Sequence, residues 1–380
     1  MDRVPGKFVL LALAAALCAA ALILDGPWFI RHIQVPAFYL PASPRGPLAL
    51  RASLAAAAVL CFLLAVRVRG SLGAVARIAL ASLLAVGTAE LILRRGESGT
   101  TFWRARKLEL RMGRPDAALG NVLVPSRTTV LAAPGAKPVS YAIDAWGDRA
   151  ASDGGAPDPA LPSLLVAGES IAIGHGLPFE QTFAAQLAAR LGLSLVNVAV
   201  GGYGTDQAFW RLQETLPRLQ RPAVVVMVFL PIQLRRNVQD YRPRLVLKDG
   251  RLVREEPVTG FFASLRLRDL AVNELPVLSE EKLRDSLAVT AAVLREAAAQ
   301  ARARGATPCF LVPVVGPRRR LDEHPEAQVL RPLFIEQGLP FVLVDLDESE
   351  LIPYDGHPNA AASKRLAEAL EARLREAMRC

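Results

Sequence analysis

The pattern of apolar positions divides the chain into a lipophilic first quarter and a remainder in which short apolar runs alternate with amphipathic stretches. Three long apolar runs cover residues 8–24, 48–66 and 71–93. Each is close to the ~20 residues that a helix needs to cross a bilayer. The pattern predicts a transmembrane region with about three helices over residues 1–95. A cleaved signal segment followed by two spans is the alternative, although no A-x-A-like cleavage site follows the first run.

Beyond residue 160 the periodicity is that of an α/β domain. Amphipathic or helical stretches separate five short apolar runs, which lie at residues 164–167, 195–200, 223–230, 309–315 and 341–345. Continuous apolar strands that alternate with helices are typical of a parallel sheet covered on both faces. Residues 161–380 are therefore predicted to form a three-layer, doubly wound domain around a parallel five-stranded sheet.

Two segments depart from this alternation. Residues 96–160 are rich in Pro, Gly and Ala, and we expect a linker or transitional segment there, with short β-like runs such as Asn121–Val124 and Ser140–Ile143. Residues 235–278 interrupt the α/β pattern. Within them, the Asp249-Gly250 pair lies between alternating apolar positions and predicts a β-hairpin.

Composition and charge support a membrane region and argue against nucleic-acid binding. Apolar residues make up 52% of the chain and charged residues 21%, which is more lipophilic than an average soluble domain. The net charge is +9, but residues 1–95 alone hold ten Lys and Arg against three Asp and Glu. The basic excess thus belongs to the apolar region. The four cysteines show neither a disulfide framework nor the paired spacing of a zinc site.

The basic residues also bear on orientation in a membrane, and they conflict. Arg3 and Lys7 precede the first apolar run, and Arg67 and Arg69 lie in the loop after the second. If these four residues lie in the cytoplasm, as the positive-inside rule predicts, three spans place the C-terminal domain outside it. A basic cluster over residues 94–107 favours the opposite orientation. Because the first helix usually dominates, we expect a multi-pass membrane protein with an extracytoplasmic C-terminal domain.

Candidate functional residues follow three of the predicted strands. Ser170 comes directly after the first strand, and Asp355 and His357 follow the fifth. Ligands of such sheets bind beyond the carboxyl ends of the strands. A serine hydroxyl becomes a nucleophile when an imidazole takes its proton, and an acid fixes the tautomer of that imidazole. The glycine-rich stretch 201–204 follows the second strand and can offer backbone N–H groups to an oxyanion.

Each feature alone has a simpler reading, as a helix N-cap, a solvated loop histidine or a tight turn. Their combination resembles the SGNH, or GDSL-like, hydrolase family over roughly residues 161–380. The similar blocks read GESIAIGHG, NVAVGGYGTDQ and DGHPN. An upstream stretch, SYAIDAWGDRA, resembles a segment that precedes this domain in membrane-anchored members.

The resemblance implies a flavodoxin-like SGNH fold and a role for each matching residue. Ser170 would be the nucleophile, His357 the general base and Asp355 the group that orients it. The backbone N–H groups of Ser170 and Gly202 would form the oxyanion hole.

The sequence departs from the family pattern at two places. Glu169 replaces the usual Asp before the serine. After the third strand, Ile232 stands where the family has an Asn that donates to the oxyanion, and Gln233 stands where it has an Asp. Losing such a donor costs about 2.7–4 kcal/mol of barrier. Gln233 or Asn237 is the candidate to donate to the oxyanion in place of that Asn.

The sequence gives weaker evidence of a functional role for the other polar candidates. His175 either lines the pocket or has a loop role, and we expect the loop role. We expect His324 to be solvated. Residues 318–320 either meet an anionic substrate or form an exposed basic loop, and we expect the exposed loop. Cys309 is expected in the core, and Cys18 and Cys61 in the membrane helices. The sequence shows no metal-binding cluster and no phosphate-binding loop, so no cofactor is expected.

These observations predict a serine esterase or acyltransferase that acts on a carbohydrate O-acyl ester or a lipid ester. The alternative is a catalytically degenerate binding module in envelope polysaccharide assembly. The expected partners are the lipid bilayer and a small ester or glycan substrate, with no nucleic acid. The oligomeric state stays open.

Overall fold

The computed structural model describes residues 5–23, 45–67, 72–95, 112–131, 138–269, 280–315, 327–353 and 355–377. By its contacts the chain forms two compact units. The helical unit comprises residues 1–100 and 260–280, and the α/β unit comprises residues 101–259 and 281–380. Each unit is described by itself below.

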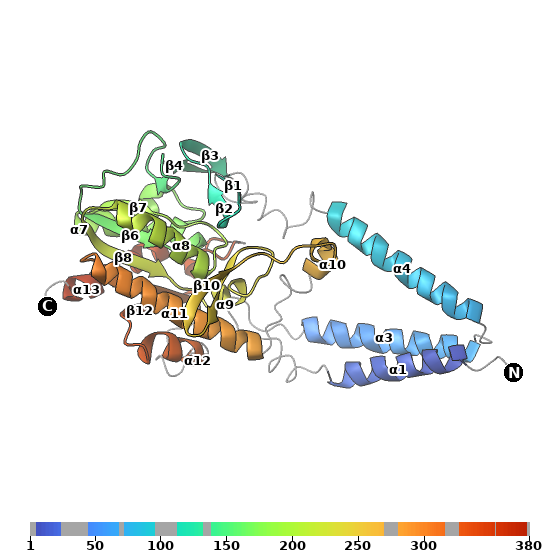
Figure 1. Ribbon diagram of the computed structural model, residues 1–380. Coiled ribbons are helices and arrows are strands. Elements are labelled where there is room, and N and C mark those ends of the chain that lie inside the picture. Colours follow the sequence, from blue (N-terminus) through green and yellow to red (C-terminus); the bar gives the residue numbers. More distant parts are fainter. Residues whose placement is uncertain are drawn as a thin grey trace. The chain divides into compact units, whose positions relative to one another are not determined.

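The helical unit contains helices at all three of the apolar runs (Figure 1). They are α1 (Pro5–Ile23), α3 (Arg45–Arg67) and α4 (Leu72–Arg95). Helices α1 and α3 lie side by side, and the Arg51 Nε on α3 donates to the Ala21 carbonyl on α1 at 2.8 Å. Within the described residues, no helix combines the length and the apolar character needed to cross a bilayer. The structure does not support the membrane anchor, which stays a prediction from the sequence.

The second segment of the helical unit is tied to α4 through one carboxylate. Residues 260–280 include two short helices, η4 (Phe262–Ser264) and α10 (Arg266–Asp269). The Glu90 carboxylate accepts hydrogen bonds from the backbone N–H groups of Arg266 and Leu267, both at 2.9 Å. Glu90 also pairs with Arg94 one turn along α4, at 2.7 Å. The predicted interruption of the α/β pattern therefore belongs partly to the helical unit.

The α/β unit is built on an eight-stranded sheet in the order β12-β11-β8-β6-β7-β5-β4-β3. Its parallel strands are β6 (Ser163–Ala167), β7 (Ser194–Asn197), β8 (Pro222–Val228), β11 (Thr307–Val315) and β12 (Phe341–Leu346). Taken in chain order, these five strands have the 2-1-3-4-5 arrangement of a flavodoxin-like sheet. The predicted parallel five-stranded core is confirmed.

The sheet is larger than the sequence predicted. Three antiparallel strands continue it beyond β7: β5 (Arg149–Ala150), β4 (Val139–Ile143) and β3 (Arg127–Leu131). All three come from the segment that was expected to be a linker. The β-like run expected at residues 140–143 lies in β4, whereas β3 is largely exposed and β5 has only two residues, so no apolar run marks these two strands. The expectation of five strands is therefore corrected to eight.

Two hairpins stand apart from the main sheet. One joins β1 (Gly113–Asp116) to β2 (Gly120–Leu123). The other joins β9 (Arg244–Lys248) to β10 (Arg251–Glu255), as the Asp249-Gly250 pair predicted. Both turn residues of the second hairpin have positive φ, which is the conformation that a two-residue type I′ turn requires.

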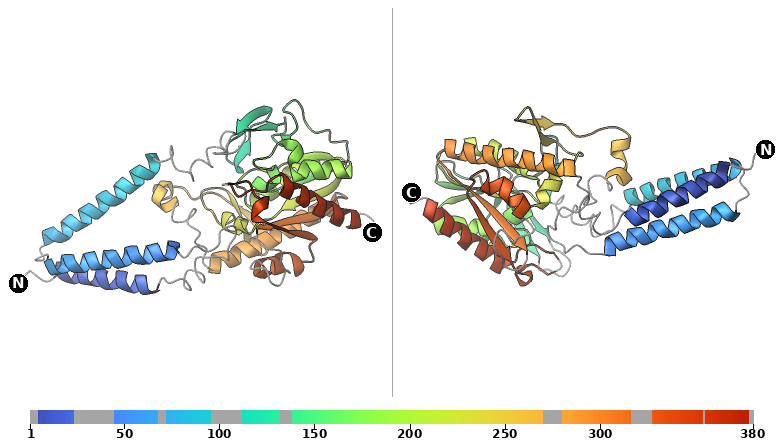
Figure 2. Two further views of the ribbon diagram at one scale, coloured as in Figure 1. Left: turned by 180° about the vertical axis from the view of Figure 1, so that it is seen from behind. Right: turned by 90° about the horizontal axis from the view of Figure 1, so that it is seen from below.

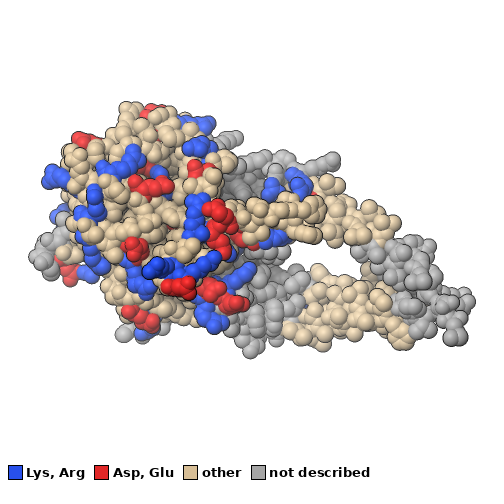
Figure 3. Space-filling model, in the orientation of Figure 1, with Lys and Arg blue, Asp and Glu red and all other residues tan. Residues whose placement is uncertain are grey.

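Helices cover both faces of the parallel strands. The longer ones are α7 (Phe183–Leu191), α8 (Thr205–Thr215), α11 (Glu280–Ala303) and α13 (Ala360–Ala377), and the shorter ones are α6 (Ser170–Ile173), α9 (Ile232–Arg236) and α12 (Ala327–Leu330). Figure 2 shows α11 and α13 on opposite sides of the sheet. On one side, Leu164 and Val166 of β6 pack in one core cluster with Leu187 of α7 and Leu366 of α13. On the face seen in Figure 3, basic and acidic side chains of this unit are interspersed.

A buried ion pair fixes the start of α8 beside the candidate site. Arg242 donates from its two terminal nitrogens to the two oxygens of Asp206, at 2.8 and 3.0 Å. The side chains are 4% and 0% exposed. Arg242 also donates to the Arg236 carbonyl at 2.7 Å, which ties the end of α9 to the start of α8.

We predict that Arg242→Ala lowers the free energy of unfolding by about 3–5 kcal/mol, because the buried Asp206 carboxylate then loses its cationic partner and keeps only backbone N–H donors. Chemical unfolding followed by tryptophan fluorescence measures this. The matched control is Arg373→Ala, which removes the exposed pair with Glu376 and should cost less than about 1 kcal/mol. Equal losses in the two variants would contradict the structural role of the buried pair.

Candidate active site

Ser170 lies at the turn between β6 and α6. Gly168, which follows β6, has a φ of 153°, and a Cβ there would lie 2.7 Å from the Cβ of Ala172. Only glycine fits this turn without displacing α6. Ser170 opens the helix and is 8% exposed. Its Oγ lies 2.8 Å from the Nε2 of His357, a residue 187 positions further along the chain.

His357 is held by the loop that follows β12. Its Nδ1 is hydrogen-bonded to Asp355 Oδ1, and its carbonyl accepts from the Ile352 N–H at 2.7 Å. A bridge between Leu351 and Pro358 closes the same loop. With the Nδ1 proton donated to Asp355, Nε2 is the acceptor that faces Ser170. The structure thus brings the serine, the histidine and the acid of the sequence analysis into one hydrogen-bonded chain.

Asp355 contacts a second histidine. The Nε2 of His175 lies 3.4 Å from Asp355 Oδ2, and the two imidazole rings have centroids 4.3 Å apart. Burial works to raise the pKa of Asp355, but the polar contact with His175, the hydrogen bond from His357 and the coulombic attraction of the two rings outweigh it. They hold that pKa well below its usual range, so the carboxylate stays ionised.

His175 lies on a loop, as expected, and it also contacts Asp355 of the candidate site. The sequence showed only a histidine between two glycines, without its partner. Ligand atoms of His175, Asp355 and His357 all lie within 4.8 Å of one another. Among the described residues, these three therefore meet the distance condition for holding a metal ion, which the sequence analysis did not foresee.

Glu169 is a buried carboxylate under the serine. One oxygen accepts from the Ile171 N–H at 2.9 Å, and the other accepts from the Ser170 hydroxyl. The guanidinium of Arg236, which the sequence did not single out, lies 3.7 Å from Glu169 and donates to the Tyr203 carbonyl at 3.1 Å. Because the hydroxyl has one proton, it donates either to Glu169 or to His357, and attack requires the second arrangement.

The glycine loop lies against the same turn. The Val198 N–H donates to the Val166 carbonyl at 2.9 Å, and the Val200 N–H donates to the Gly168 carbonyl at 3.3 Å. These bonds bring the loop that holds Gly202 alongside the turn that holds Ser170. The first N–H groups of a helix have no partner within it, which leaves the Ser170 N–H available to an oxyanion.

The two side chains considered as substitute oxyanion donors, Asn237 and Gln233, make hydrogen bonds to other parts of the fold. The Asn237 amide donates to the hydroxyls of Thr205 and Thr290, at 2.6 and 2.9 Å, and its oxygen accepts from the Thr205 N–H. Gln233 is fully buried, accepts from the Leu230 N–H at 2.8 Å and makes a long contact of 3.4 Å with the Tyr203 carbonyl. Asn237 is therefore committed to joining α8 to α11, and Gln233 mainly holds the turn after β8.

The remaining candidate residues lie away from the hydrogen-bonded Asp355, His357 and Ser170, or outside the described residues. Cys309 is in the core, as predicted, and burial raises the pKa of its thiol to about 11. Cys18 and Cys61 lie on α1 and α3. His324 and residues 318–320 lie outside the described residues.

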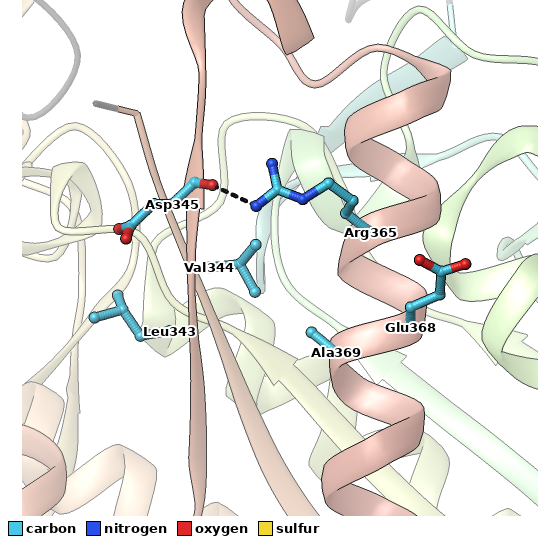
Figure 4. Close-up of a pocket in the computed structure, with 6 residues that line it drawn as sticks. All are labelled: Leu343, Val344, Asp345, Arg365, Glu368 and Ala369. Carbon is cyan, nitrogen blue, oxygen red and sulfur yellow. Dashed lines mark hydrogen bonds between the residues drawn. The ribbon is translucent and has the colours of Figure 1, made fainter. Parts of the chain in front are cut away.

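A pocket of about 370 Å³ opens at the edge of the sheet between β12 and α13 (Figure 4). It is lined by Leu343, Val344, Asp345, Arg365, Glu368 and Ala369. In Figure 4 the Arg365 side chain reaches across to the Asp345 carbonyl, at 2.9 Å. Since none of the hydrogen-bonded chain lines this pocket, it is not part of the candidate active site.

Comparisons with known proteins give fold-level similarity alone. No protein-family model and no curated protein matches the chain. A putative lipolytic protein of the G-D-S-L family from Desulfitobacterium hafniense is 11% identical over 56% of this chain and 98% of its own, with a TM-score of 0.33. An acetyl xylan esterase from Butyrivibrio proteoclasticus is 14% identical over 59% and 66%, with a TM-score of 0.33.

A salicylyl-acyltransferase from a tetracycline biosynthetic pathway is 16% identical over 60% of this chain and 57% of its own, with a TM-score of 0.28. The chain spans less than two thirds of this protein and of the xylan esterase. At these identities and TM-scores the similarity assigns neither a substrate nor a residue role, and the candidate site rests on its own geometry.

We predict that Asp355→Asn lowers kcat/KM for ester cleavage by about 10⁴-fold, because the amide no longer accepts the Nδ1 proton and His357 takes the wrong tautomer. Steady-state assays on a p-nitrophenyl ester measure this. Asp347→Asn, an exposed change near the same loop, should leave the rate within about twofold. A fully active Asp355→Asn enzyme would remove this carboxylate from the reaction.

Proposed function

We propose that this protein is an SGNH-type serine hydrolase that cleaves ester bonds, by hydrolysis or by acyl transfer. The observation that supports it best is the hydrogen-bonded chain Asp355–His357–Ser170, assembled from two loops at the carboxyl ends of parallel strands. A structural role for these side chains would not require a serine aligned at 2.8 Å with an acceptor nitrogen.

The proposed reaction begins with attack of Ser170 Oγ on the acyl carbon while His357 Nε2 takes the hydroxyl proton. The charge on the resulting imidazolium is stabilised by the ionised Asp355. Backbone N–H groups of Ser170 and Gly202 bind the oxyanion of the tetrahedral intermediate. When the intermediate collapses, His357 returns the proton to the leaving alcohol and an acyl-serine remains. Water or an acceptor alcohol then takes the acyl group by the same steps in reverse order.

For the substrate we propose a carbohydrate O-acyl ester or a lipid ester. Support comes from the membrane anchor that the sequence predicts, with which such esters are consistent, and not from a described pocket at the site. Hydrolysis and transfer use the same side chains, and the two differ only in whether water or an alcohol reaches the acyl-serine.

One observation favours a second candidate, a binding module without turnover. Ile232 is half-buried and packs against the core where the family has a donating Asn, and Asn237 is committed to Thr205 and Thr290. The oxyanion would then depend on the two backbone N–H donors. The Gln233 amide, which makes only a long contact with the Tyr203 carbonyl, is the remaining side-chain donor. With too few donors to stabilise the oxyanion, such a site would bind an ester without cleaving it.

The test of catalysis is covalent labelling. A fluorophosphonate probe should modify Ser170 in the wild-type protein, identified by peptide mass spectrometry, and Ser170→Ala should abolish both labelling and p-nitrophenyl ester turnover. Ser152→Ala, at an exposed loop serine, is the matched control and should retain both. Absence of labelling together with absence of turnover in the folded wild-type protein would favour the binding module.

We further propose that the α/β unit works outside the cytoplasm of a cell whose membrane holds the helical unit. The support is the sequence alone, since Arg3 and Lys7 precede the first apolar run and the first helix usually fixes orientation. Alkaline phosphatase fused after Cys380 should be active and green fluorescent protein at that point dark. Fusions after Gly70 should show the reverse pattern. A bright C-terminal fusion with inactive phosphatase would overturn this location.

A further inference from the structure

The carboxylate at the centre of the site is shared between two imidazoles. Asp355 Oδ1 is hydrogen-bonded to His357, and Asp355 Oδ2 lies 3.4 Å from the Nε2 of His175. The second distance is long for an N–H···O hydrogen bond, which is usually about 2.7–3.2 Å. The proposed reaction needs only one histidine, so the second calls for its own explanation.

The spacing between His175 and Asp355 suits a divalent metal ion, and the hydrogen bond between Asp355 and His357 would open to admit it. Zinc binds histidine nitrogen and carboxylate oxygen at about 2.0–2.2 Å, so two ligand atoms in a tetrahedral site lie roughly 3.3 Å apart. The gap between His175 and Asp355 is 3.4 Å, and one ligand atom from each of the three residues lies within 4.8 Å of the others. Two histidines and one carboxylate form a donor set that zinc sites in proteins use, with a fourth position left for water.

The ligands are held in place and are reachable from solvent. The loop that carries His175 is anchored on both sides, because the Gly176 N–H donates to the Tyr141 hydroxyl at 2.6 Å and the His175 N–H donates to the Ser170 carbonyl at 2.9 Å. Arg149, buried, donates to the Ile173, Gly174 and Leu177 carbonyls around the same loop. The side chains of His175, Asp355 and His357 are 19%, 19% and 27% exposed. An ion can reach them without unfolding the loop.

Metal binding would reverse the tautomer on which the reaction depends. In the hydrogen-bonded chain, His357 carries its proton on Nδ1 and accepts at Nε2. A metal ion on Nδ1 leaves the proton of the neutral ring on Nε2, where it points at Ser170 Oγ. His357 then donates to the serine and cannot take its proton. The ring stays neutral and the fold stays intact, but the base is lost.

We propose that His175, Asp355 and His357 form a zinc-binding site that switches off the serine by fixing the proton of His357 on Nε2. The inhibition rests on the proposed function, whereas the metal site does not. His175 is then the residue that gives this active site its sensitivity to zinc.

Binding is measured first in the Ser170→Ala variant, which keeps all three ligands and needs no activity. Calorimetry with zinc chloride should show one ion per chain, and cobalt(II) should give the visible absorption bands of a tetrahedral site. His175→Asn in this background keeps an amide donor for Asp355 but removes the imidazole. It should weaken zinc binding by at least about 10-fold. His324→Asn, the same change at a histidine outside the three motifs, should leave binding unchanged.

Inhibition is measured next in the otherwise wild-type enzyme, with each variant compared with its own metal-free rate. Zinc should inhibit ester turnover reversibly, with full recovery after a chelator is added. His175→Asn should raise the zinc concentration for half-inhibition by at least about 10-fold. No binding, or binding that His175→Asn does not weaken while circular dichroism shows a folded chain, overturns the proposal. Zinc binding without fluorophosphonate labelling of Ser170 would instead count against the proposed function and leave the metal site standing.

Discussion

The hydrogen bond between Ser170 Oγ and His357 Nε2 is the contact on which the site depends. Strands β6 and β12 are separated in the sheet by β8 and β11, a span of roughly 14 Å at about 4.8 Å per strand. The loop after β12 must cross this span and still present an imidazole within hydrogen-bond reach. Its closure by the Leu351–Pro358 bridge and by the Ile352–His357 backbone bond explains how a loop can hold that position.

Buried charges around this contact are compensated by short-range partners. The carboxylate of Glu169 meets Arg236 and the Ile171 N–H, and Asp206 is paired with Arg242. Such pairs add little net stability over apolar packing, and their removal is costly. They do fix geometry, since each joins elements that carry part of the site: the serine turn to α9, and the start of α8 to the end of α9. Around the serine, these buried ion pairs thus serve mainly to fix the positions of the elements and add little to the stability of the fold.

Much of the fold could be predicted because its parallel strands are buried on both faces and read as continuous apolar runs. The Asp249-Gly250 hairpin was predictable from local turn chemistry. A short β-like run marked β4, but β3 and β5 were not predictable, because short strands at the side of a sheet need no long apolar run. The meeting of Ser170 with His357 followed from a topological rule about strand ends. The approach of His175 to Asp355 did not, because it depends on the shape of two loops that no local pattern encodes.

Strand β12 ends the sheet on one side, and the last strand of any sheet offers unpaired backbone groups to other chains. Here the Arg365 guanidinium, held by Glu350, already occupies the Asp345 carbonyl. A foreign strand seeking to extend the sheet would have to displace this arginine before it could bond there. This contact makes intermolecular β-pairing harder at the Asp345 carbonyl, close to the start of the loop that carries His357.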